Sequence, residues 1–302
     1  MVSTTRASRE AELAVFGPNG PRLFAILRTV IRELDEKPVR YKYISVEDHK
    51  ALLEKDLSEG IRVQTVELLY HAHFAAVATL VRAYRWAEGC LAAYSSDLFL
   101  PFCAAARGLL EAVGDSFDAL PQVPLSLAKN HLIIQAALAA KTPPPLVNYK
   151  QIEDALLHFS HARRVDKKQK SEVPDYLPAK LASTYTKPLE AYGPGGFYAW
   201  YQELCELAHP ASDSVCYMLI QQDDGQLAFH PSIDRERIRN HITAHQQRLT
   251  ELLRLSQVPA LVMLRVLSHI GPSELRVSSL NDIGISHIPL WRKCAAAMSV
   301  AP

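Results

Sequence analysis

The chain has 302 residues and is nearly balanced in charge, with 33 Lys and Arg residues against 32 Asp and Glu residues. A hydrophobic content of 48% and a charged content of 22% are typical of a globular protein with a sizeable core, and they exclude a largely disordered chain. A net charge of +1 argues against a broad nucleic-acid surface, because phosphate neutralisation requires a basic excess. Any nucleic-acid site must therefore be local.

The sequence gives little indication of disulfides, of a cysteine-bound metal, of a secretory signal or of a membrane-spanning segment. The five cysteines are widely spaced without a CxxC pair, which argues against a structural zinc site or a disulfide framework, and no cofactor is predicted. The opening residues MVSTTRASRE are polar and lack the apolar stretch of a secretory signal. The most apolar span, residues 98–114, contains two charged residues and favours a buried helix over a membrane crossing. We therefore expect a cytoplasmic protein with no membrane partner.

The first half of the chain predicts one helical region. Residues 1–19 read as a flexible leader, and a helical region follows over 20–142. Apolar residues recur with a period of 3.6 between Pro21 and Pro38, and again over a longer stretch across residues 66–91. Pro101 then opens a central helix, predicted over 101–119.

The triple proline at 143–145 is the best candidate for a hinge or domain boundary. A second helical region is expected over 143–270, packed on the first, so that both regions could form one domain. Residues 215–229 leave two alternatives open, a small hairpin around Asp224-Gly225 or a helix end followed by a loop. Residues 271–302 predict an irregular C-terminal tail.

Together these patterns predict an all-α fold, a multi-helix bundle-like assembly with at most one short β-hairpin. Alternating strand and helix patterns are absent, which disfavours a doubly wound α/β fold. The sequence also lacks GxxxxGK[ST], a GxGxxG after a strand, HExxH and GxSxG. Common nucleotide hydrolases, dinucleotide oxidoreductases, zincin proteases and α/β-hydrolases are therefore improbable.

Two charges stand out in the apolar stretch PFCAAARGLLEAVG. Arg107 and Glu111 are its only charged residues, and their spacing of i and i+4 puts them on one helix face. Burying them requires polar partners. The segment FYAWYQELCELAHP offers Tyr201, Cys205 and His209 as one stripe. We predict a core cluster of Arg107, Glu111, Tyr201 and His209, which either fixes helix register or binds an anion, with His209 moving protons.

These two segments carry a family resemblance. ARGLLE, an AR-x-L-x-E motif, precedes YQELCELAHP, a Y-x-x-L-x-E-x-x-H-P motif, by roughly 90 residues. The combination resembles a pattern seen in uncharacterised bacterial α-helical proteins, some of them associated with mobile elements, abortive infection or defence loci. The resemblance covers roughly residues 61–215. It implies an all-helical fold and a bacterial origin, and it brings no known activity.

A second segment resembles the motif of HEPN ribonucleases, in which an Arg and a polar residue precede a His on a late helix. Here Arg239 and Asn240 precede His245 in RNHITAH. The resemblance implies that His245 acts as base or acid at a ribose 2′-OH, and that Arg239 stabilises the phosphate. A spacing of six residues puts the two on different sides of an ideal helix, so a dimer or a distortion would be needed. The alternative is a solvated helix face.

The basic run that begins at Arg163 and Arg164 could contact RNA phosphates or could be a solvated loop. Cys205 and His209 could share a helix face, but no further metal ligands suggest themselves, so no metal site is predicted. Two functional classes stay open. The favoured one is an interaction or regulatory protein, with a protein partner or self-association. The other is a HEPN-like ribonuclease or a small anion-binding enzyme.

Overall fold

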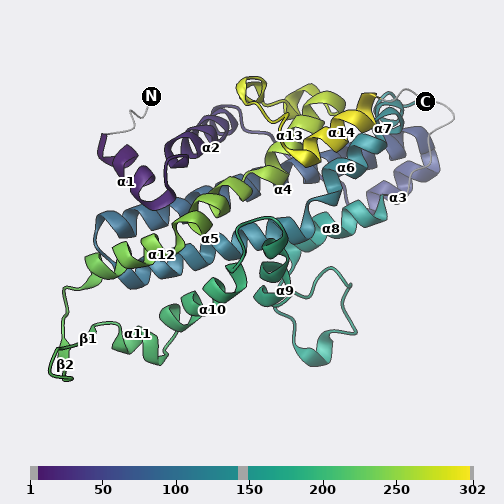
Figure 1. Ribbon diagram of the computed structural model, residues 1–302. Coiled ribbons are helices and arrows are strands. Elements are labelled where there is room, and N and C mark those ends of the chain that lie inside the picture. The colour runs from purple at the N-terminus through teal and green to yellow at the C-terminus, as the bar shows by residue number, and fades with distance from the viewer. Residues whose placement is uncertain (1–5, 142–148, 300–302) are drawn as a thin grey trace. The chain divides into compact units, whose positions relative to one another are not determined.

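A computed structural model describes residues 6–141 and 149–299 of the chain (Figure 1). Within these residues the protein is all-α, apart from one two-stranded antiparallel hairpin, as the sequence predicted. The predicted hinge at 143–145 lies outside the described residues. No helix in the described part of the chain combines the length and the apolar character that spanning a bilayer requires.

The chain divides into two compact units, each built from three stretches of sequence. Unit 1 comprises Met1–Leu27, Val81–Asp115 and Leu181–Gln257. Unit 2 comprises Arg28–Leu80, Ser116–Lys180 and Val258–Pro302. This interleaved division differs from the consecutive regions predicted over 20–142 and 143–270. The reason is that three long helices each continue from one unit into the other.

Those three helices are α2 (Gly20–Glu36), α4 (Leu57–Ser95) and α5 (Phe99–Ala119). Helix α5 begins two residues before the predicted central helix 101–119 and ends at the same residue. The other elements of unit 1, in chain order, are α1 (Arg6–Phe16), α9 (Ala182–Thr186), η2 (Lys187–Ala191), α10 (Phe197–Ala208), α11 (Ser212–Cys216), β1 (Leu219–Gln221), β2 (Leu227–Phe229) and α12 (Asp234–Leu255).

Helix α1 corrects the prediction of a flexible leader over 1–19. Val15 and Phe16 are fully buried, and the Phe16 ring meets Phe24 edge-on at a centroid distance of 5.4 Å. Thr250 of α12 donates a hydrogen bond of 2.7 Å to the Phe16 carbonyl. The apolar stripe of α1 therefore belongs to the core of unit 1, and its polar opening residues had concealed this in the sequence.

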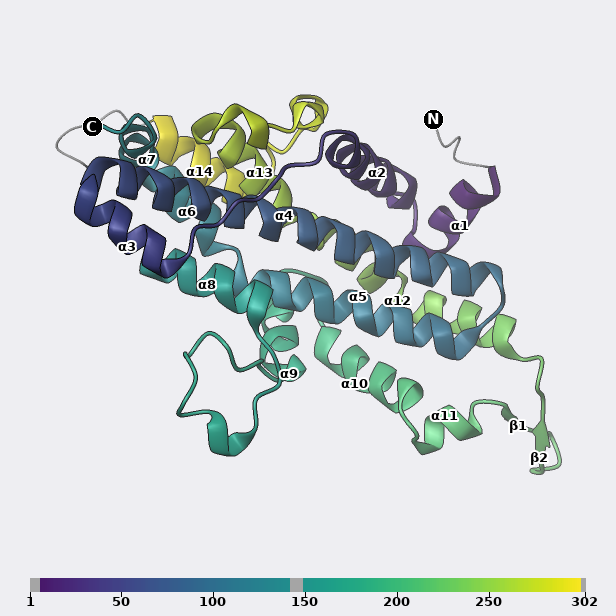
Figure 2. The ribbon, with the colours of Figure 1, turned by 180° about the vertical axis from the view of Figure 1, so that it is seen from behind.

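The hairpin alternative for residues 215–229 is the correct one. Strands β1 and β2 pair Leu219 with Phe229 and Gln221 with Leu227. Gly225 sits in the turn with a φ of +81°, a left-handed conformation that glycine adopts at little cost. The hairpin connects α11 to α12, as both views show (Figures 1 and 2).

Unit 2 has its own helical core. Besides parts of the long helices, its elements are α3 (Val46–Lys55), α6 (Gln122–Lys129), α7 (His131–Leu138), α8 (Lys150–His161), η1 (Lys167–Gln169), α13 (Val258–Ile270), η3 (Ser273–Leu275), η4 (Ser278–Asp282) and α14 (Pro289–Ser299). Helix α14 packs on α6, and Cys294, Leu275 and Leu280 are buried. The predicted irregular tail over 271–302 is therefore wrong for α14, whereas residues 271–288 form only the short 3₁₀ turns η3 and η4 between irregular stretches.

Candidate functional site in unit 1

Helix α10 carries two polar faces and an apolar one. It starts after Gly196, which has a φ of +74°, and it ends at Ala208. His209 follows in the extended conformation expected before a proline. Trp200 and Leu204 are buried in the core. On either side of them lie the polar residues that form two separate clusters with α5 and α12.

The first cluster forms around Arg107 of α5, and we call it the Arg107 cluster: Arg107, Glu111, Tyr201, Cys205 and His209. Arg107 Nε donates to Glu111 Oε1 at 2.9 Å, and its Nη1 donates to His209 Nε2 at 2.7 Å. The Tyr201 ring centroid lies 5.9 Å from Arg107 Cζ. The structure thus brings together the four residues that the sequence grouped.

The burial of the Arg107 cluster differs from the prediction. The side chains of Arg107 and Glu111 remain 22% and 29% exposed, and His209 is exposed. Helix α5 buries its apolar face through residues such as Phe102 and Leu109. The ion pair therefore lies on a flank of the helix that solvent reaches, and not inside the core. A ligand can reach this flank without opening the unit.

Charge states in the Arg107 cluster follow from these contacts. Burial alone would lower the pKa of Arg107, but the Glu111 carboxylate outweighs it, and the net shift is upward. Burial, followed by the hydrogen bond with Cys205, raises the pKa of Tyr201, so the phenol keeps its proton. Because a guanidinium can only donate, His209 Nε2 must accept, and its imidazole is neutral in this arrangement. A permanent cation therefore lies beside a neutral imidazole.

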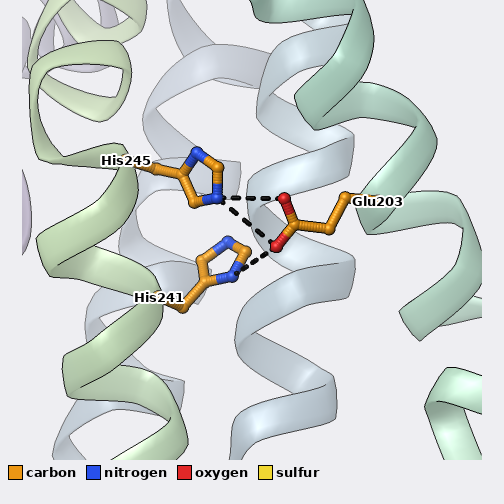
Figure 3. Close-up of side chains that lie close together, drawn as sticks. All are labelled: Glu203, His241 and His245. Atoms are coloured by element: carbon orange, nitrogen blue, oxygen red, sulfur yellow. Dashed lines mark hydrogen bonds and ion pairs between the residues drawn. The ribbon is translucent and has the colours of Figure 1, made fainter.

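The second cluster lies between α10 and α12 and is absent from the sequence predictions (Figure 3). Glu203 extends from α10 toward His241 and His245, which are one turn apart on α12. His241 Nδ1 is 3.2 Å from Glu203 Oε1, and His245 Nε2 is 3.0 Å from Glu203 Oε2. Only 4% and 11% of the two histidine side chains are exposed, against 41% for Glu203. These three residues are the Glu203 cluster.

Each imidazole of the Glu203 cluster accepts a hydrogen bond from one further donor, and this bond fixes its tautomer. Trp200 Nε1 donates to His241 Nε2 at 3.0 Å, and Arg248 Nη1 donates to His245 Nδ1 at 3.0 Å. Each ring must therefore carry its proton on the nitrogen that faces Glu203. The Glu203 carboxylate accepts one N–H hydrogen bond from His241 and one from His245. These two bonds, the one from His241 having the larger effect, hold the pKa of Glu203 far below its usual range.

The ligand atoms of the Glu203 cluster lie within 4.8 Å of one another, which raises the question of a metal ion. A histidine that binds a metal normally donates its other N–H to an acceptor. Here the other nitrogens of His241 and His245 face donors. A metal bound by both rings would require two imidazolates, or the displacement of both the buried Trp200 indole and the Arg248 guanidinium. The hydrogen-bond pattern fits a carboxylate that orients two neutral imidazoles and does not fit a metal.

A pocket of about 400 Å³ borders the Glu203 cluster. Besides the cluster, it is lined by polar residues that include Arg237 and Asn240 from the same face of α12. Arg237 Nε donates to the Tyr217 carbonyl at 2.9 Å. One N–H group of the Arg237 guanidinium thus positions the segment that leads into the hairpin.

The HEPN-like pair is not brought together within one chain. Helix α12 is continuous from Asp234 to Leu255, with Arg239 exposed and His245 turned inward toward Glu203. The alternative of a solvated face is also wrong for His241 and His245, which are largely buried. Arg163 and Arg164 are exposed and belong to unit 2, where Arg163 forms an isolated bridge with Pro178.

Comparison with known proteins gives no relative to consult: no protein-family model matches the chain, and no curated protein and no solved structure is significantly similar to it. Function must therefore be inferred from the chemistry of the two clusters.

Proposed function

We propose that the chain is an interaction or regulatory protein of a bacterial accessory or defence system, and that it responds to a ligand with a phosphate or carboxylate group bound at the Arg107 cluster. One observation carries the proposal. Arg107 lies on a solvent-accessible flank, and one of its N–H groups donates a hydrogen bond to the exposed neutral imidazole of His209.

Anion binding would follow from a simple exchange of partners. An anionic oxygen is a better acceptor for Arg107 Nη1 than a neutral ring nitrogen, because both partners of the new bond are charged. Glu111 would keep its bond to Nε, and the Tyr201 ring would keep the guanidinium plane oriented. The released His209 Nε2 could then take a proton and contact the same anion.

The protonation pattern supports binding over catalysis. In the Glu203 cluster both nitrogens of His241 and both of His245 are engaged, so neither ring offers a free base to the pocket. In the Arg107 cluster, His209 is the single imidazole. An acid–base mechanism would require it to serve as both base and acid.

A HEPN-like ribonuclease is the second candidate, and the contact between Arg107 and His209 is the observation that favours it. Cleavage of RNA by its own 2′-OH requires a base for the hydroxyl proton and a cation for the charge on the phosphorane. His209 Nε2 could accept that proton as the 2′-oxygen bonds to phosphorus, and return it to the leaving 5′-oxygen as the P–O5′ bond breaks. Arg107 could stabilise the charge on the phosphate oxygens. The same residues would then act on the bound phosphate.

The test of the proposal is a titration of the full chain with inorganic phosphate and with acetate, followed by the NMR signals of the His209 imidazole. We expect saturable shifts in the wild type and in Arg235→Gln, which alters an exposed arginine of unit 1 as a matched control. Arg107→Gln should weaken binding at least tenfold, and Arg107→Lys should restore part of it. Anion binding that Arg107→Gln leaves unchanged would overturn the proposal.

Incubation with total RNA separates the two candidates. Phosphate binding without cleavage supports the regulatory protein. Cleavage that His209→Ala abolishes supports the ribonuclease at the Arg107 cluster. Cleavage that His245→Ala abolishes, and that His209→Ala leaves intact, would instead support the HEPN-like motif on α12, acting between two chains.

A further inference from the structure

A pocket of about 430 Å³ lies in unit 2, and none of its residues takes part in the proposed function. It is formed by the segment before α3, by α4 and by α8. Five of its six lining residues carry an aromatic or imidazole ring; the lining consists of Tyr41, Tyr43, His71, Phe74, Leu157 and His161. A pocket of this size can enclose a small planar ligand and is rich in the surfaces on which such ligands stack.

The rings of this pocket are held in fixed, nearly perpendicular orientations. Tyr41 meets Phe74 at a centroid distance of 5.7 Å and an interplanar angle of 77°. His71 meets His161 at 6.0 Å and 86°. The hydroxyl of Tyr41 is bonded to Nδ1 of the buried His73 at 2.8 Å. The walls are therefore preorganised, which lowers the entropic cost of binding.

A single hydroxyl connects the two imidazoles of the pocket. Ser160 Oγ lies 2.7 Å from His71 Nε2, 2.7 Å from His161 Nδ1 and 2.7 Å from the Leu156 carbonyl. The hydroxyl has one proton for these three partners. At least one imidazole must therefore donate its own N–H to Ser160, and a neutral ring that does so keeps a lone pair on its other nitrogen.

Those other nitrogens, His71 Nδ1 and His161 Nε2, have no hydrogen-bond partner among the residues that the structure describes. Burial, and secondarily the neighbouring His161, lowers the pKa of His71 to about 4, so this ring is neutral at physiological pH. The six lining residues include no Lys, Arg, Asp or Glu. The lining offers no counter-ion for a phosphate and no carboxylate for an ammonium group.

We propose that this pocket binds a neutral heteroaromatic ring with at least one N–H donor, as in the adenine ring of adenosine. The ring faces supply stacking, the lack of charged lining selects against ionic groups, and the imidazole lone pair accepts the donor. An aromatic ring without such a donor would displace water from that imidazole nitrogen and leave it unpaired in the complex, which lowers the affinity.

The test is calorimetric titration of the full chain with adenosine as the probe. N6,N6-dimethyladenosine, whose exocyclic amine has no N–H, is the matched ligand control. We expect saturable binding of adenosine and at least fivefold weaker binding of the dimethylated compound. Tetramethylammonium chloride, a probe for an aromatic cation cage, should not bind.

Variants locate the binding site. Phe74→Leu keeps most of the volume but removes a stacking face, and it should weaken adenosine binding at least fivefold. Phe229→Leu, at an exposed aromatic residue of unit 1, should leave binding unchanged. Tyr43→Leu, at a residue that is 57% exposed, provides a second pocket variant if Phe74→Leu does not fold.

Four results would each overturn the inference. The first is the absence of saturable adenosine binding by the folded wild type. The second is equal affinity for adenosine and its dimethylated form. The third is adenosine binding that both pocket variants leave unchanged. Binding of tetramethylammonium in place of adenosine would show a cation site and contradict it as well.

Discussion

Glu203 is the residue whose ionisation depends most directly on its neighbours. Two imidazole N–H groups from α12 point at its carboxylate, and they lower its pKa below the ordinary value of 4.5. A carboxylate with a lowered pKa stabilises the fold above the pKa of the unfolded state. That stabilisation is lost as the pH falls through the native pKa. The folded protein should therefore lose stability in acid below about pH 4.5 through this residue.

Substitution of Glu203 by Gln tests this linkage. The amide keeps one acceptor but turns a donor toward the second imidazole, so we expect a loss of about 1 kcal/mol at pH 7, moderated by the partial exposure of the site. Between about pH 4.5 and pH 3 the variant should lose less stability than the wild type. Urea unfolding at several pH values measures both effects. Glu206→Gln, at an exposed residue of α10, is the control and should show the same dependence of stability on pH as the wild type. If all three proteins show the same dependence, the lowered pKa of Glu203 does not contribute to stability.

The tautomers of the Glu203 cluster lead to a prediction about zinc. Because His241 and His245 turn their remaining acceptors toward Trp200 and Arg248, neither ring can bind a metal without losing a hydrogen bond. Addition of micromolar Zn²⁺ or of a chelator should leave the Tm unchanged in thermal unfolding. A rise in Tm with Zn²⁺ that His245→Ala abolishes would contradict the prediction, because it would show that Zn²⁺ binds at the Glu203 cluster.

The sequence was informative about one cluster and silent about the other, for a physical reason. Arg107 and Glu111 are conspicuous because every other residue of the stretch 101–114 is small or apolar, so their need for partners can be inferred locally. Glu203 is one acidic residue of an ordinary amphipathic helix. Its pairing with His241 depends on how α10 packs on α12, which no local pattern encodes.

At the scale of the elements, the turn between α1 and α2 is defined by a close approach. A Cβ on Gly20 would overlap the backbone carbonyl oxygen of Glu12 and lie 3.0 Å from Phe16 Cβ. Backbone atoms cannot rotate away, so an added methyl group must push the two helices apart. Gly20 therefore sets the separation between the end of α1 and the start of α2.

Gly20→Ala should reduce the free energy of unfolding by about 1–3 kcal/mol. Gly284→Ala is a matched control, because a Cβ at Gly284 would have no atom within 4 Å. That control should be neutral or should stabilise the protein by up to about 1 kcal/mol, through the loss of unfolded-state entropy. Chemical denaturation of both variants measures the difference. Equal stabilities would show that α1 is not packed against α2 as the structure places it.

Elements were predicted well where the apolar pattern was long, as for the central helix. The Asp224-Gly225 turn offered a hairpin as one of two alternatives, and the structure decides for the hairpin. Helix α1 was missed because it buries a short apolar stripe between polar residues. Helix α14 was missed because Cys294 is its one buried residue among those described. Helices with so few buried residues gain their stability from tertiary contacts more than from helix propensity.

For the whole molecule, the interleaving of the two units determines how the chain can be divided. Unit 1 takes residues from both sides of the triple proline, and Leu181–Gln257 supplies the buried Trp200, Leu204 and Leu252. A fragment of residues 1–141 would contain α5 without the helices that cover its apolar face. No local pattern reveals this, because it depends on helices that continue from one unit into the other.

Expression of residues 1–141 and 149–302 as separate fragments tests the interleaving. We expect neither fragment to unfold cooperatively on heating, and both to bind the dye ANS, because each exposes apolar surface that the intact chain buries. Mixing the two fragments should restore a cooperative transition, since every stretch of both units is then present apart from the short segment between them. A cooperative transition in the isolated 1–141 fragment would mean that its helices form a core without Leu181–Gln257. The triple proline would then mark a true domain boundary.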